Sequence, residues 1–428
     1  MTTTDVYQMA AGVNVATQNL TESAHIPEHN LKILLLENIH PDATAILAGA
    51  GYQVENSPGA LSEDELVEKI RGVHLIGIRS NTKITERVLA AADSLLAIGA
   101  FCIGTNQIDL PAATKRGIAV FNAPYSNTRS VVELVIGEII CLARRLPQKN
   151  QNMHAGIWDK SAIGSHEVRG RKMGIVGYGN IGSQLSVVAE SLGFSVYFFD
   201  TADKLALGNA KKVNSLDELL AVSDVVTLHV DGRPGNAGLF GAREFAKMQP
   251  RSIFLNLSRG MVVDHAALRE NILSGHLAGA SVDVFPHEPK NRGDEFVSEL
   301  RGLPNVILTP HVGGSTEEAQ VDIGNFVATK FRSFIEDGST SLSVNLPTLD
   351  LPAREGSRRI MHTHHNMPGV LAAINQVLAE NGANIEGQFL STRGDLGYVI
   401  TDVACDVPPN VFQALAAMSQ TIRLRLLS

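Results

Sequence analysis

The stretch that most constrains the fold is a glycine-rich turn between an apolar run and a helix-forming run. Residues 172–176 suit a buried strand, Gly177, Gly179 and Gly182 follow with Gly-x-Gly-x-x-Gly spacing, and residues 183–191 have helical periodicity. In such a unit the first glycine permits the turn, the second lets backbone approach a pyrophosphate, and the third lets helix and strand pack closely. The anion would lie at the positive end of the helix dipole. The stretch predicts a dinucleotide-binding α/β domain.

A second predicted strand, residues 195–200, ends in Asp200, 23 residues after Gly177. A carboxylate near this offset binds the adenosine ribose of NAD and repels the 2′-phosphate of NADP. Residues 201–203 supply no Arg that would receive such a phosphate. We therefore predict NAD rather than NADP as the cofactor. The alternative is an ordinary strand–helix turn followed by a surface Asp.

The totals limit the class of protein. A chain of 428 residues predicts roughly two to four domains. The 44 acidic against 36 basic residues give a net charge of −8, which argues against nucleic acid or an anionic membrane as the main partner. Cys102, Cys141 and Cys405 have no metal-ligand or disulfide spacing, so we expect a reducing, cytoplasmic location. No apolar run reaches the ~18 residues of a membrane span.

Residues 1–30 contain no Lys or Arg, which fits neither a secretory signal nor a transit peptide. We expect this segment to be a flexible arm.

Strands and helices alternate along two stretches of the chain, which is typical of parallel sheets covered by helices on both faces. A helix at residues 130–145 would connect the two stretches, a helix at 324–334 would return, and the polar segment 338–352 would be a linker. The tail from residue 357 predicts the order βαββαβ. The predicted strands of the two stretches are 31–36, 52–55, 75–78, 95–98 and 119–121, and then 172–176, 196–199, 225–229, 252–256, 279–283 and 306–308.

Charged residues follow three predicted strands of the second stretch, at the strand ends where ligands bind in open α/β sheets. Arg259 offers a two-donor fork for a carboxylate or keto oxygen. His311 suits the base that an alcohol needs when it is oxidised by hydride transfer, because its pKa lies near working pH. Glu288 is the carboxylate that would fix the tautomer of His311. The alternatives are a surface Arg and a structural His.

Together these motifs resemble the D-isomer-specific 2-hydroxyacid dehydrogenases over about residues 30–350. The resemblance implies that Arg259 binds the substrate carboxylate and carbonyl, that Glu288 and His311 form the acid–base pair, and that Asp283 holds the nicotinamide amide. The residues that it implies for NAD binding are Gly177, Gly179, Asn180, Ile181, Gly182, Asp200, Leu257, Ser258, Arg259, Asp283, His311, Val312, Gly313 and Gly314.

The resemblance also implies an architecture of two doubly wound parallel-sheet domains, with a Rossmann domain inserted in a flavodoxin-like domain. The predicted divisions are a flexible arm at 1–29, a substrate-binding domain at 30–128 and 318–345, an NAD-binding domain at 129–317, a linker at 346–356 and a small regulatory domain at 357–428.

Within the family, the chain is most similar to members that oxidise D-3-phosphoglycerate in L-serine synthesis. The segments that carry this similarity are residues 78–82, 103–109 and 122–128, and they imply that Arg79, Ser80, Gly104, Thr105 and Arg259 contact the substrate. Asn81 stands where some relatives have a second basic residue, so the phosphate site would draw on Arg144 or a neighbouring subunit. The alternatives are a dehydrogenase of another acid such as 2-hydroxyglutarate, and a non-catalytic NAD-sensing scaffold.

The tail resembles an ACT domain, an amino-acid-sensing module, from residues 361–371 onward. This implies L-serine as an effector bound between paired subunits by His364, Asn366 and Asn384, and it implies a homotetramer. His365 and Met367 stand where relatives often carry charged residues. The alternatives are an ACT fold used only for assembly, and a metal cluster at residues 362–365, for which no third ligand is suitably spaced. We expect no metal.

Overall fold

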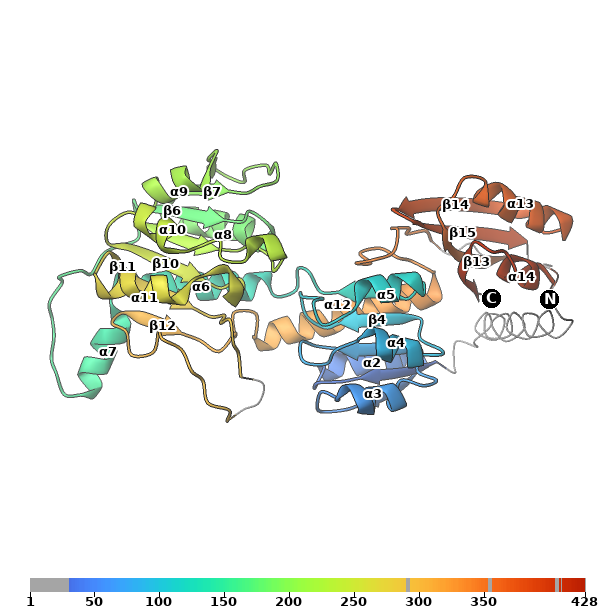
Figure 1. Cartoon of the computed structure of the whole chain (residues 1–428), viewed down its shortest axis with the longest axis horizontal. Helices are drawn as coiled ribbons and strands as arrows, with labels where there is room; N and C mark the ends of the chain where they lie inside the picture. Colours follow the sequence, from blue (N-terminus) through green and yellow to red (C-terminus); the bar gives the residue numbers. More distant parts are fainter. Residues whose placement is uncertain (1–30, 290–292, 353–355, 405–407, 409, 428) are drawn as a thin grey trace, which may run out of the picture. The chain divides into compact units, whose positions relative to one another are not determined.

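The computed structural model describes residues 31–289, 293–352, 356–404, 408 and 410–427. The chain forms two compact units (Figure 1): residues 125–319 make up one, and the segments before and after them make up the other. One unit is therefore an insertion in the other. The arm predicted at residues 1–29 lies outside the described residues.

The first unit begins with a parallel sheet in the order β2-β1-β3-β4-β5, which is the flavodoxin-like order. Its strands are β1 (Lys32–Leu35), β2 (Gln53–Asn56), β3 (Leu75–Ile78), β4 (Ala97–Ala100) and β5 (Ala119–Asn122). Its helices are α2 (Pro41–Gly49), α3 (Glu63–Lys69), α4 (Glu86–Ala91), α5 (Leu110–Lys115) and the returning α12 (Glu317–Glu336), whose first three residues belong to the inserted unit.

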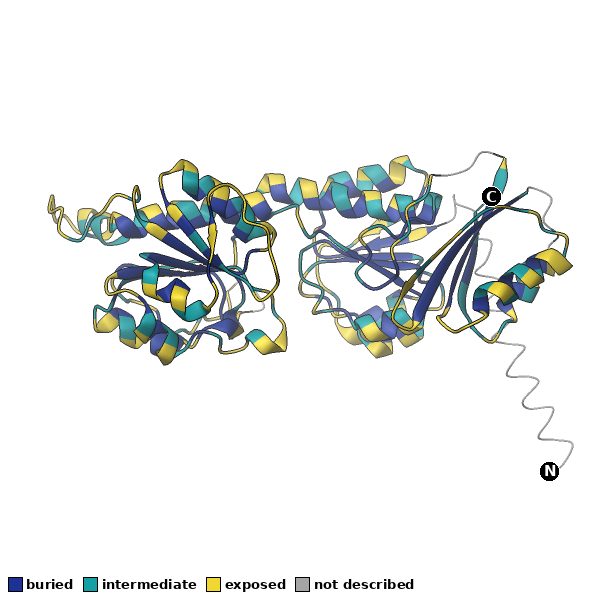
Figure 2. Ribbon diagram, turned by 90° about the horizontal axis from the view of Figure 1, so that it is seen from above, coloured by how far each residue is buried: buried dark blue, intermediate teal, exposed yellow. Residues whose placement is uncertain are grey.

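Successive residues of β1 face opposite sides of this sheet, as the strand period of two requires. Ile33 and Leu35 pack with α2 and α12, whereas Leu34 packs with α3, α4 and α5 on the other face. Figure 2 shows the result, with buried strands between helices that are buried only on their inner sides. Local sequence signals agree, since Ser62 and Glu65 form the capping box of α3.

The inserted unit has a parallel seven-stranded sheet in the order β12-β11-β10-β9-β6-β7-β8. Its strands are β6 (Lys172–Val176), β7 (Ser195–Phe199), β8 (Lys211–Lys212), β9 (Val225–Leu228), β10 (Ser252–Asn256), β11 (Leu277–Val282) and β12 (Val306–Leu308). Its helices are α6 (Thr128–Ala143), α7 (Leu146–His154), α8 (Asn180–Ser191), α9 (Leu216–Val222), α10 (Ala242–Lys247) and α11 (His265–Leu273), with short 3-10 turns η2 (Pro234–Asn236) and η3 (Gly260–Val262).

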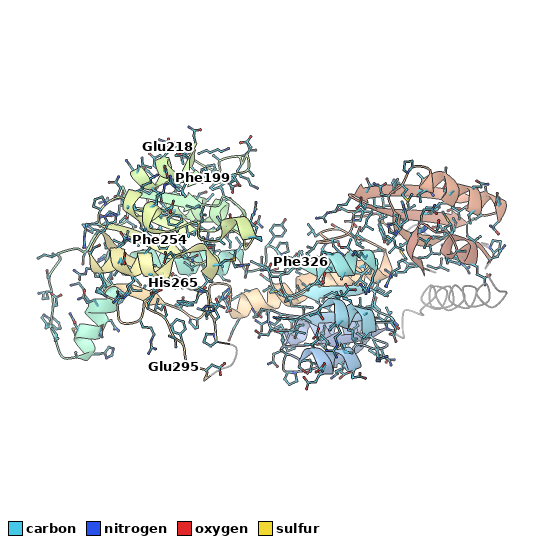
Figure 3. The ribbon with its side chains drawn as sticks, in the orientation of Figure 1. Phe199, Glu218, Phe254, His265, Glu295 and Phe326 are labelled. Carbon is cyan, nitrogen blue, oxygen red and sulfur yellow. The ribbon has the colours of Figure 1, made fainter. Side chains whose placement is uncertain are left out.

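Helices cover both faces of this second sheet. Residues of α6 and α8 pack on one face, and residues of α9, α10 and α11 pack on the other. Figure 3 labels Phe254 of β10, which lies fully buried under the second group, and His265, the first residue of α11. Both sheets are doubly wound, which confirms the predicted fold class.

The C-terminal module is a four-stranded antiparallel sheet in the order β14-β15-β13-β16. Two helices pack on one face, and Met361, Tyr398 and Ile400 form a small cluster on the other. Its elements are β13 (Ser357–His365), α13 (Val370–Glu380), β14 (Ile385–Arg393), β15 (Leu396–Ala404), α14 (Asn410–Ala416) and β16 (Thr421–Leu427). The predicted βαββαβ order is confirmed.

Three of the differences from the sequence prediction have a local physical reason. The strand predicted at 95–98 is β4 at Ala97–Ala100, because Leu95 and Leu96 are buried ahead of the strand rather than in it. The helix predicted at 130–145 ends at Ala143, and Arg145 in the left-handed region (φ 54°) redirects the chain into α7. The helix predicted at 324–334 is longer, because acidic residues at its start extend it to Glu317.

The segment predicted as a linker, residues 338–352, is held in place. The Asn345 side chain accepts a hydrogen bond from the Val120 N–H (2.9 Å) and donates to the Ile118 carbonyl (2.8 Å). The Tyr398 hydroxyl donates to the Gly338 carbonyl at 2.8 Å. The Asn345 side chain thus ties this segment to the edge strand β5, and its role as a linker between domains stays a prediction.

Across the described ranges, no helix has both the length and the apolarity needed to cross a membrane.

Glu138 lies inside the inserted unit, on α6, with 5% of its surface exposed. Burial raises the pKa of Glu138 to about 7, the Asp283 charge adds to the rise, and the Ser281 hydroxyl opposes it. In the unfolded chain the same carboxyl titrates near 4.5. The native state therefore keeps a proton that the unfolded chain releases between these two pH values.

Because the folded pKa is the higher one, the stability contributed by protonated Glu138 is complete below about pH 4.5 and is lost as pH rises through about 7. Glu138→Gln removes this titration. Relative to wild type, we expect the free energy of unfolding of the variant to rise by about 2–3 kcal/mol between pH 5 and pH 8, measured by thermal or urea unfolding. Glu133→Gln, an exposed control on the same helix, should give a curve parallel to wild type. Parallel curves for Glu138→Gln would contradict the assignment.

Candidate active site

The glycine-rich turn joins β6 to α8, and two of its glycines are required by close packing. Gly177 has φ 92°, and a Cβ there would lie 2.6 Å from the His229 carbonyl oxygen at the end of β9. A Cβ on Gly182 would lie 2.2 Å from the Gly177 carbonyl oxygen. By contrast, a Cβ on Gly179 would meet no atom within 4 Å. The open side of Gly179 is where a pyrophosphate has room to approach backbone.

The helix that follows is suited to an anion. Gly179 is the N-cap of α8 and makes no side-chain cap, and Asn180, Ile181 and Gly182 form the first turn. The N–H groups of a first turn and the helix dipole favour a negative ligand. The turn therefore fits the phosphates of a dinucleotide. It lies where the strand order of the sheet reverses, between β6 and β9, which is where ligands bind in other open α/β sheets.

Asp200 follows β7, beside this turn. Its carboxylate accepts hydrogen bonds from the Tyr178 N–H and the Ala202 N–H, both at 2.8 Å. Arg233 is a nearby cation that the sequence did not point to. The hydrogen bond and charge of Asp231 raise the pKa of Arg233 most, and the Asp200 charge adds a smaller rise. Asp231 binds the Arg233 guanidinium through two oxygens, at 2.7 and 2.5 Å. Arg233 is thus engaged by a carboxylate, which disfavours its use for a 2′-phosphate.

Three loops with charged residues leave neighbouring strands. β10, β11 and β12 are adjacent and parallel, so Arg259, Glu288 and His311 come from the same edge of the sheet. Two of these loops pack closely at Gly260. Only glycine fits there, because a Cβ would lie 2.0 Å from the Phe285 carbonyl carbon.

His311 and Glu288 form a hydrogen-bonded pair. The Nδ1 atom of His311 lies 2.9 Å from Oε2 and 3.1 Å from Oε1 of Glu288, and both side chains are partly exposed, at 50% and 38%. A carboxylate only accepts, so Nδ1 carries the hydrogen and Nε2 is left to exchange a proton. The Phe285 N–H donates to Glu288 at 3.1 Å and helps to orient it.

The pair shifts both pKa values. The hydrogen bond to Glu288 raises the pKa of His311, although burial opposes the rise. Burial tends to raise the pKa of Glu288, but the His311 and Phe285 hydrogen bonds together lower it. The Arg259 charge lowers both pKa values slightly, which places its guanidinium within electrostatic reach of the pair.

Asp283 organises the His311 loop. Its carboxylate, 1% exposed, accepts hydrogen bonds from the Thr309 hydroxyl (2.7 Å), the Val312 N–H (2.8 Å) and the Gly313 N–H (2.9 Å). His311 itself is in the left-handed region (φ 55°), and its N–H donates to the Asp283 carbonyl at 2.8 Å. The loop is closely packed at its end, where a Cβ on Gly314 would lie 2.1 Å from the Asn127 amide nitrogen.

Asn256 is a buried group that positions Arg259 and that the sequence did not point to. Asn256, fully buried at the end of β10, donates to the Arg259 carbonyl at 3.1 Å and accepts from both the N–H and the hydroxyl of Ser258. The Arg259 guanidinium donates to the Ser258 carbonyl at 2.6 Å. Leu257, also buried, packs with α6. The strand-end position of Asn256 was the signal that could have identified it.

The predicted substrate residues of the other unit also lie at strand ends. Arg79 and Ser80 follow β3, and Gly104 and Thr105 follow the neighbouring β4. Arg79 is half-buried and Ser80 is exposed. The structure thus brings these four residues to adjacent loops of the flavodoxin-like sheet.

The predicted effector residues do not meet within the C-terminal module. His364 pairs with Gly397 at the start of β15, and Asn366 donates to the Gly394 carbonyl at 3.0 Å. Asn384 precedes β14, whose first residue pairs with Val403 at the far end of β15. Six residues of strand between those points correspond to about 20 Å. His364 and Asn366 therefore lie at one end of the sheet and Asn384 at the other.

Two histidines of β13 have lowered pKa values. Burial lowers the pKa of His362 to about 3 and also lowers the pKa of His364. The His362 ring bonds the Thr421 hydroxyl at 2.8 Å. Among the described residues, no group of three or more His, Cys, Asp and Glu side chains is arranged to hold a metal ion.

Two family models match separate parts of this chain. Residues 136–313 match the D-isomer specific 2-hydroxyacid dehydrogenase NAD-binding domain, and residues 360–423 match an AHAS small subunit-like ACT domain. D-3-phosphoglycerate dehydrogenase of Escherichia coli K12 is 52% identical over 405 residues, covering 94% of this chain and 98% of that protein.

Solved structures show the same architecture. The TT0316 protein of Thermus thermophilus is 27% identical with a TM-score of 0.67, covering 73% of this chain and all of that one. The NAD-dependent formate dehydrogenase of Staphylococcus aureus, in complex with NAD, is 26% identical with a TM-score of 0.60, covering 71% and 96%.

The fold and the strand-end residues define a dehydrogenase with an NAD-binding domain. The chain belongs to the D-isomer specific 2-hydroxyacid dehydrogenase family and carries an ACT domain at its C-terminal end.

Gly182→Ala and Gly179→Ala separate packing from cofactor binding. The Gly182 variant adds a methyl 2.2 Å from a backbone oxygen, so we expect a lower melting temperature and weak NADH binding. The Gly179 variant adds a methyl into open space, so its melting temperature should equal that of wild type while its dissociation constant for NADH rises at least about tenfold. NADH fluorescence titration and thermal melting measure both effects. A Gly179 variant with unchanged NADH affinity would show that the pyrophosphate lies elsewhere.

Proposed function

We propose that the protein oxidises D-3-phosphoglycerate to 3-phosphohydroxypyruvate with NAD, the first step of L-serine biosynthesis. The observation that carries the proposal is the His311–Glu288 pair, placed with Arg259 at one edge of the NAD-binding sheet. Support for this substrate comes from relatives named D-3-phosphoglycerate dehydrogenase, including the protein of Dictyostelium discoideum, which is 47% identical over 401 residues.

Each member of the site has a distinct role in this proposal. Bound NAD supplies the acceptor for the hydride that leaves C2 of the substrate. The Nε2 atom of His311 takes the proton of the C2 hydroxyl, and Glu288 stabilises the imidazolium that results. Arg259 binds the substrate carboxylate and stabilises the forming carbonyl oxygen.

The residues proposed to bind NAD fit a cofactor through their own geometry. Gly179 leaves open space at the start of α8, and Asp200, bonded to the Tyr178 N–H beside this turn, would bind the ribose. Leu257, Ser258, Val312, Gly313 and Gly314 belong to the loops that carry Arg259 and His311. Asp283 would hold the nicotinamide amide while it anchors the His311 loop, because a carboxylate has further acceptor positions.

His311→Ala removes the proposed base and should lower kcat for oxidation at least about a thousandfold, with near-normal NADH affinity. Glu288→Gln keeps the shape of the partner but loses the charge that raises the pKa of His311. Oxidation requires neutral His311, so activity falls as pH drops below that pKa. The Gln variant should therefore have a lower kcat, and its acidic limb should lie at lower pH.

The pH profile of kcat/KM for both proteins tests this pair. Glu270→Gln, a change at an exposed carboxylate on α11, is the control and should leave the profile unchanged. Normal turnover by folded His311→Ala would refute the proposed role.

The anionic end of the substrate would be bound by Arg79, Ser80, Gly104 and Thr105, with Arg259 at the reacting end. Asn81 is exposed and uncharged, so Arg144 or a neighbouring subunit would add to the phosphate site. A 2-hydroxy acid with a distal carboxylate, such as 2-hydroxyglutarate, would use the same cation.

A cytoplasmic location is proposed from the sequence, because Cys102, Cys141 and Cys405 have no metal-ligand or disulfide spacing.

We also propose that the ACT domain binds L-serine at a site shared by two subunits of a homotetramer. Support comes from the separation of His364 and Asn366 from Asn384, since only a second copy would bring the two ends together. Phe389 and Leu390 are exposed on the edge strand β14, which suits pairing with another ACT domain. A second apolar surface is exposed on α7 and the loop after it, at Leu146, Met153, Ile157, Trp158 and Ile163, which suits pairing of the NAD-binding domains.

L-Serine should suppress NADH formation from D-3-phosphoglycerate and NAD. Asn366→Ala and Asn384→Ala should each weaken the inhibition at least about tenfold without changing activity in the absence of serine, because each removes a hydrogen-bonding amide from the shared site. Asn381→Ala, at the C-cap of α13, is the control. Inhibition that survives both substitutions would place serine elsewhere, and activity indifferent to serine would leave the ACT domain to assembly or another ligand.

A further inference from the structure

The loop that follows β3 is held by a carboxylate from a different strand. Glu37 follows β1, and its side chain accepts hydrogen bonds from three N–H groups of that loop: Oε1 from Arg79 (3.1 Å) and Thr82 (2.8 Å), and Oε2 from Asn81 (3.0 Å). Glu37 is 7% exposed. We propose that Glu37 is a positioning residue for the anionic end of the substrate, because it fixes the backbone that presents Arg79 and Ser80.

The backbone around Glu37 shows that this arrangement is specified rather than incidental. Glu37 and Asn38 have φ values of 62° and 52°, in the left-handed region that side-chain-bearing residues seldom adopt. Two consecutive residues in this region cost conformational free energy, which the surrounding structure must compensate. Three hydrogen bonds to a charged acceptor, each stronger than a neutral one, provide such compensation.

The same loop is tied to its neighbour by Gln107. The Gln107 amide nitrogen lies 2.7 Å from the Arg79 carbonyl and 3.2 Å from the Gly104 carbonyl. It also lies 3.4 Å from the Cys102 sulfur. Gln107 therefore joins the two loops that carry the proposed substrate residues, while Glu37 anchors one of them to β1.

This arrangement determines how the loop can recognise an anion. The N–H groups of Arg79, Asn81 and Thr82 point to the Glu37 carboxylate, so they are already occupied by an internal anion. Arg79, Asn81 and Thr82 must then recognise a phosphate through their side chains, and the strength of that recognition depends on how firmly the Arg79 backbone is held. A preorganised loop loses less conformational freedom when substrate binds, which strengthens binding.

The inference rests on the proposed function, since it takes Arg79 and Ser80 to bind the substrate. Glu37→Gln tests it with a minimal change in volume. The amide can place its oxygen toward Arg79 and Thr82, but its NH2 group then faces the Asn81 N–H, donor against donor. We expect the KM for D-3-phosphoglycerate to rise at least about tenfold, while kcat changes less than about threefold.

Three measurements separate positioning from simple destabilisation. The KM for NAD should stay constant, because the nucleotide residues belong to the other compact unit. Glu37→Asp keeps the charge and tolerates the left-handed backbone but shortens the side chain by one methylene, so its KM should lie between those of wild type and Glu37→Gln. Gln107→Met removes the amide at similar volume and should raise the same KM.

Asp93→Asn is the matched control. Asp93 also accepts a backbone N–H in the same unit, from Gly72 at 2.8 Å, but these two residues precede β4 and β3, whereas the substrate loops follow those strands. It should lower the melting temperature slightly and leave both KM values unchanged. All proteins are assayed as the full chain, with thermal melting to confirm folding.

The outcomes are distinguishable. A KM for D-3-phosphoglycerate within twofold of wild type in folded Glu37→Gln would overturn the inference while the proposed function stands. Equal rises in the KM for substrate and for NAD would also overturn it, since they indicate general damage. Wild-type protein that oxidises another 2-hydroxy acid but not D-3-phosphoglycerate would overturn the proposed function and the inference with it.

Discussion

Parallel alignment of β10, β11 and β12 is the constraint on which the proposed active site depends. In a parallel sheet every strand points the same way, so the loops that follow neighbouring strands emerge side by side. Arg259, Glu288 and His311 are separated by more than twenty residues in sequence, yet each leaves the same edge of the sheet. The 2.9 Å contact between His311 and Glu288 depends on that alignment. The close packing of Gly260 against the Phe285 backbone also holds the Glu288 loop beside the Arg259 loop.

Buried or half-buried carboxylates organise the loops at the strand ends of both units. Asp283 accepts hydrogen bonds from two backbone N–H groups and a hydroxyl of the His311 loop. Glu37 accepts three from N–H groups of the Arg79 loop, and Asp200 accepts two, from the N–H groups of Tyr178 and Ala202. A loop has no regular partner for its N–H groups, and an unpaired buried N–H is costly. An internal carboxylate satisfies several at once and fixes the loop before any ligand arrives. Both units of the chain use this device at the ends of their strands.

The ACT domain follows a different logic, because its proposed ligand residues are divided between the two ends of one sheet. His364 and Asn366 are fixed by the end of β13, whereas Asn384 lies at the start of β14. A site built from both ends requires two copies, which would link effector binding to subunit pairing. Under this proposal the coupling would be reciprocal: if serine favoured the paired subunits, pairing would raise the affinity for serine by the same factor.

The elements whose signals are local could be predicted from the sequence. The glycine spacing at Gly177–Gly182 and the strand periodicities predicted both doubly wound sheets and the βαββαβ tail, and the strand-end charges pointed to Arg259, Glu288 and His311. The roles of these residues and the domain boundaries stay predictions. The partners of several buried polar groups, by contrast, follow from the fold: Glu37 binds a loop 42–45 residues away, and Asn345 binds β5 more than 220 residues away. The physical reason is that propensity and periodicity act over a few residues, whereas the partner of a buried polar group is set by strand order, which the local sequence does not contain.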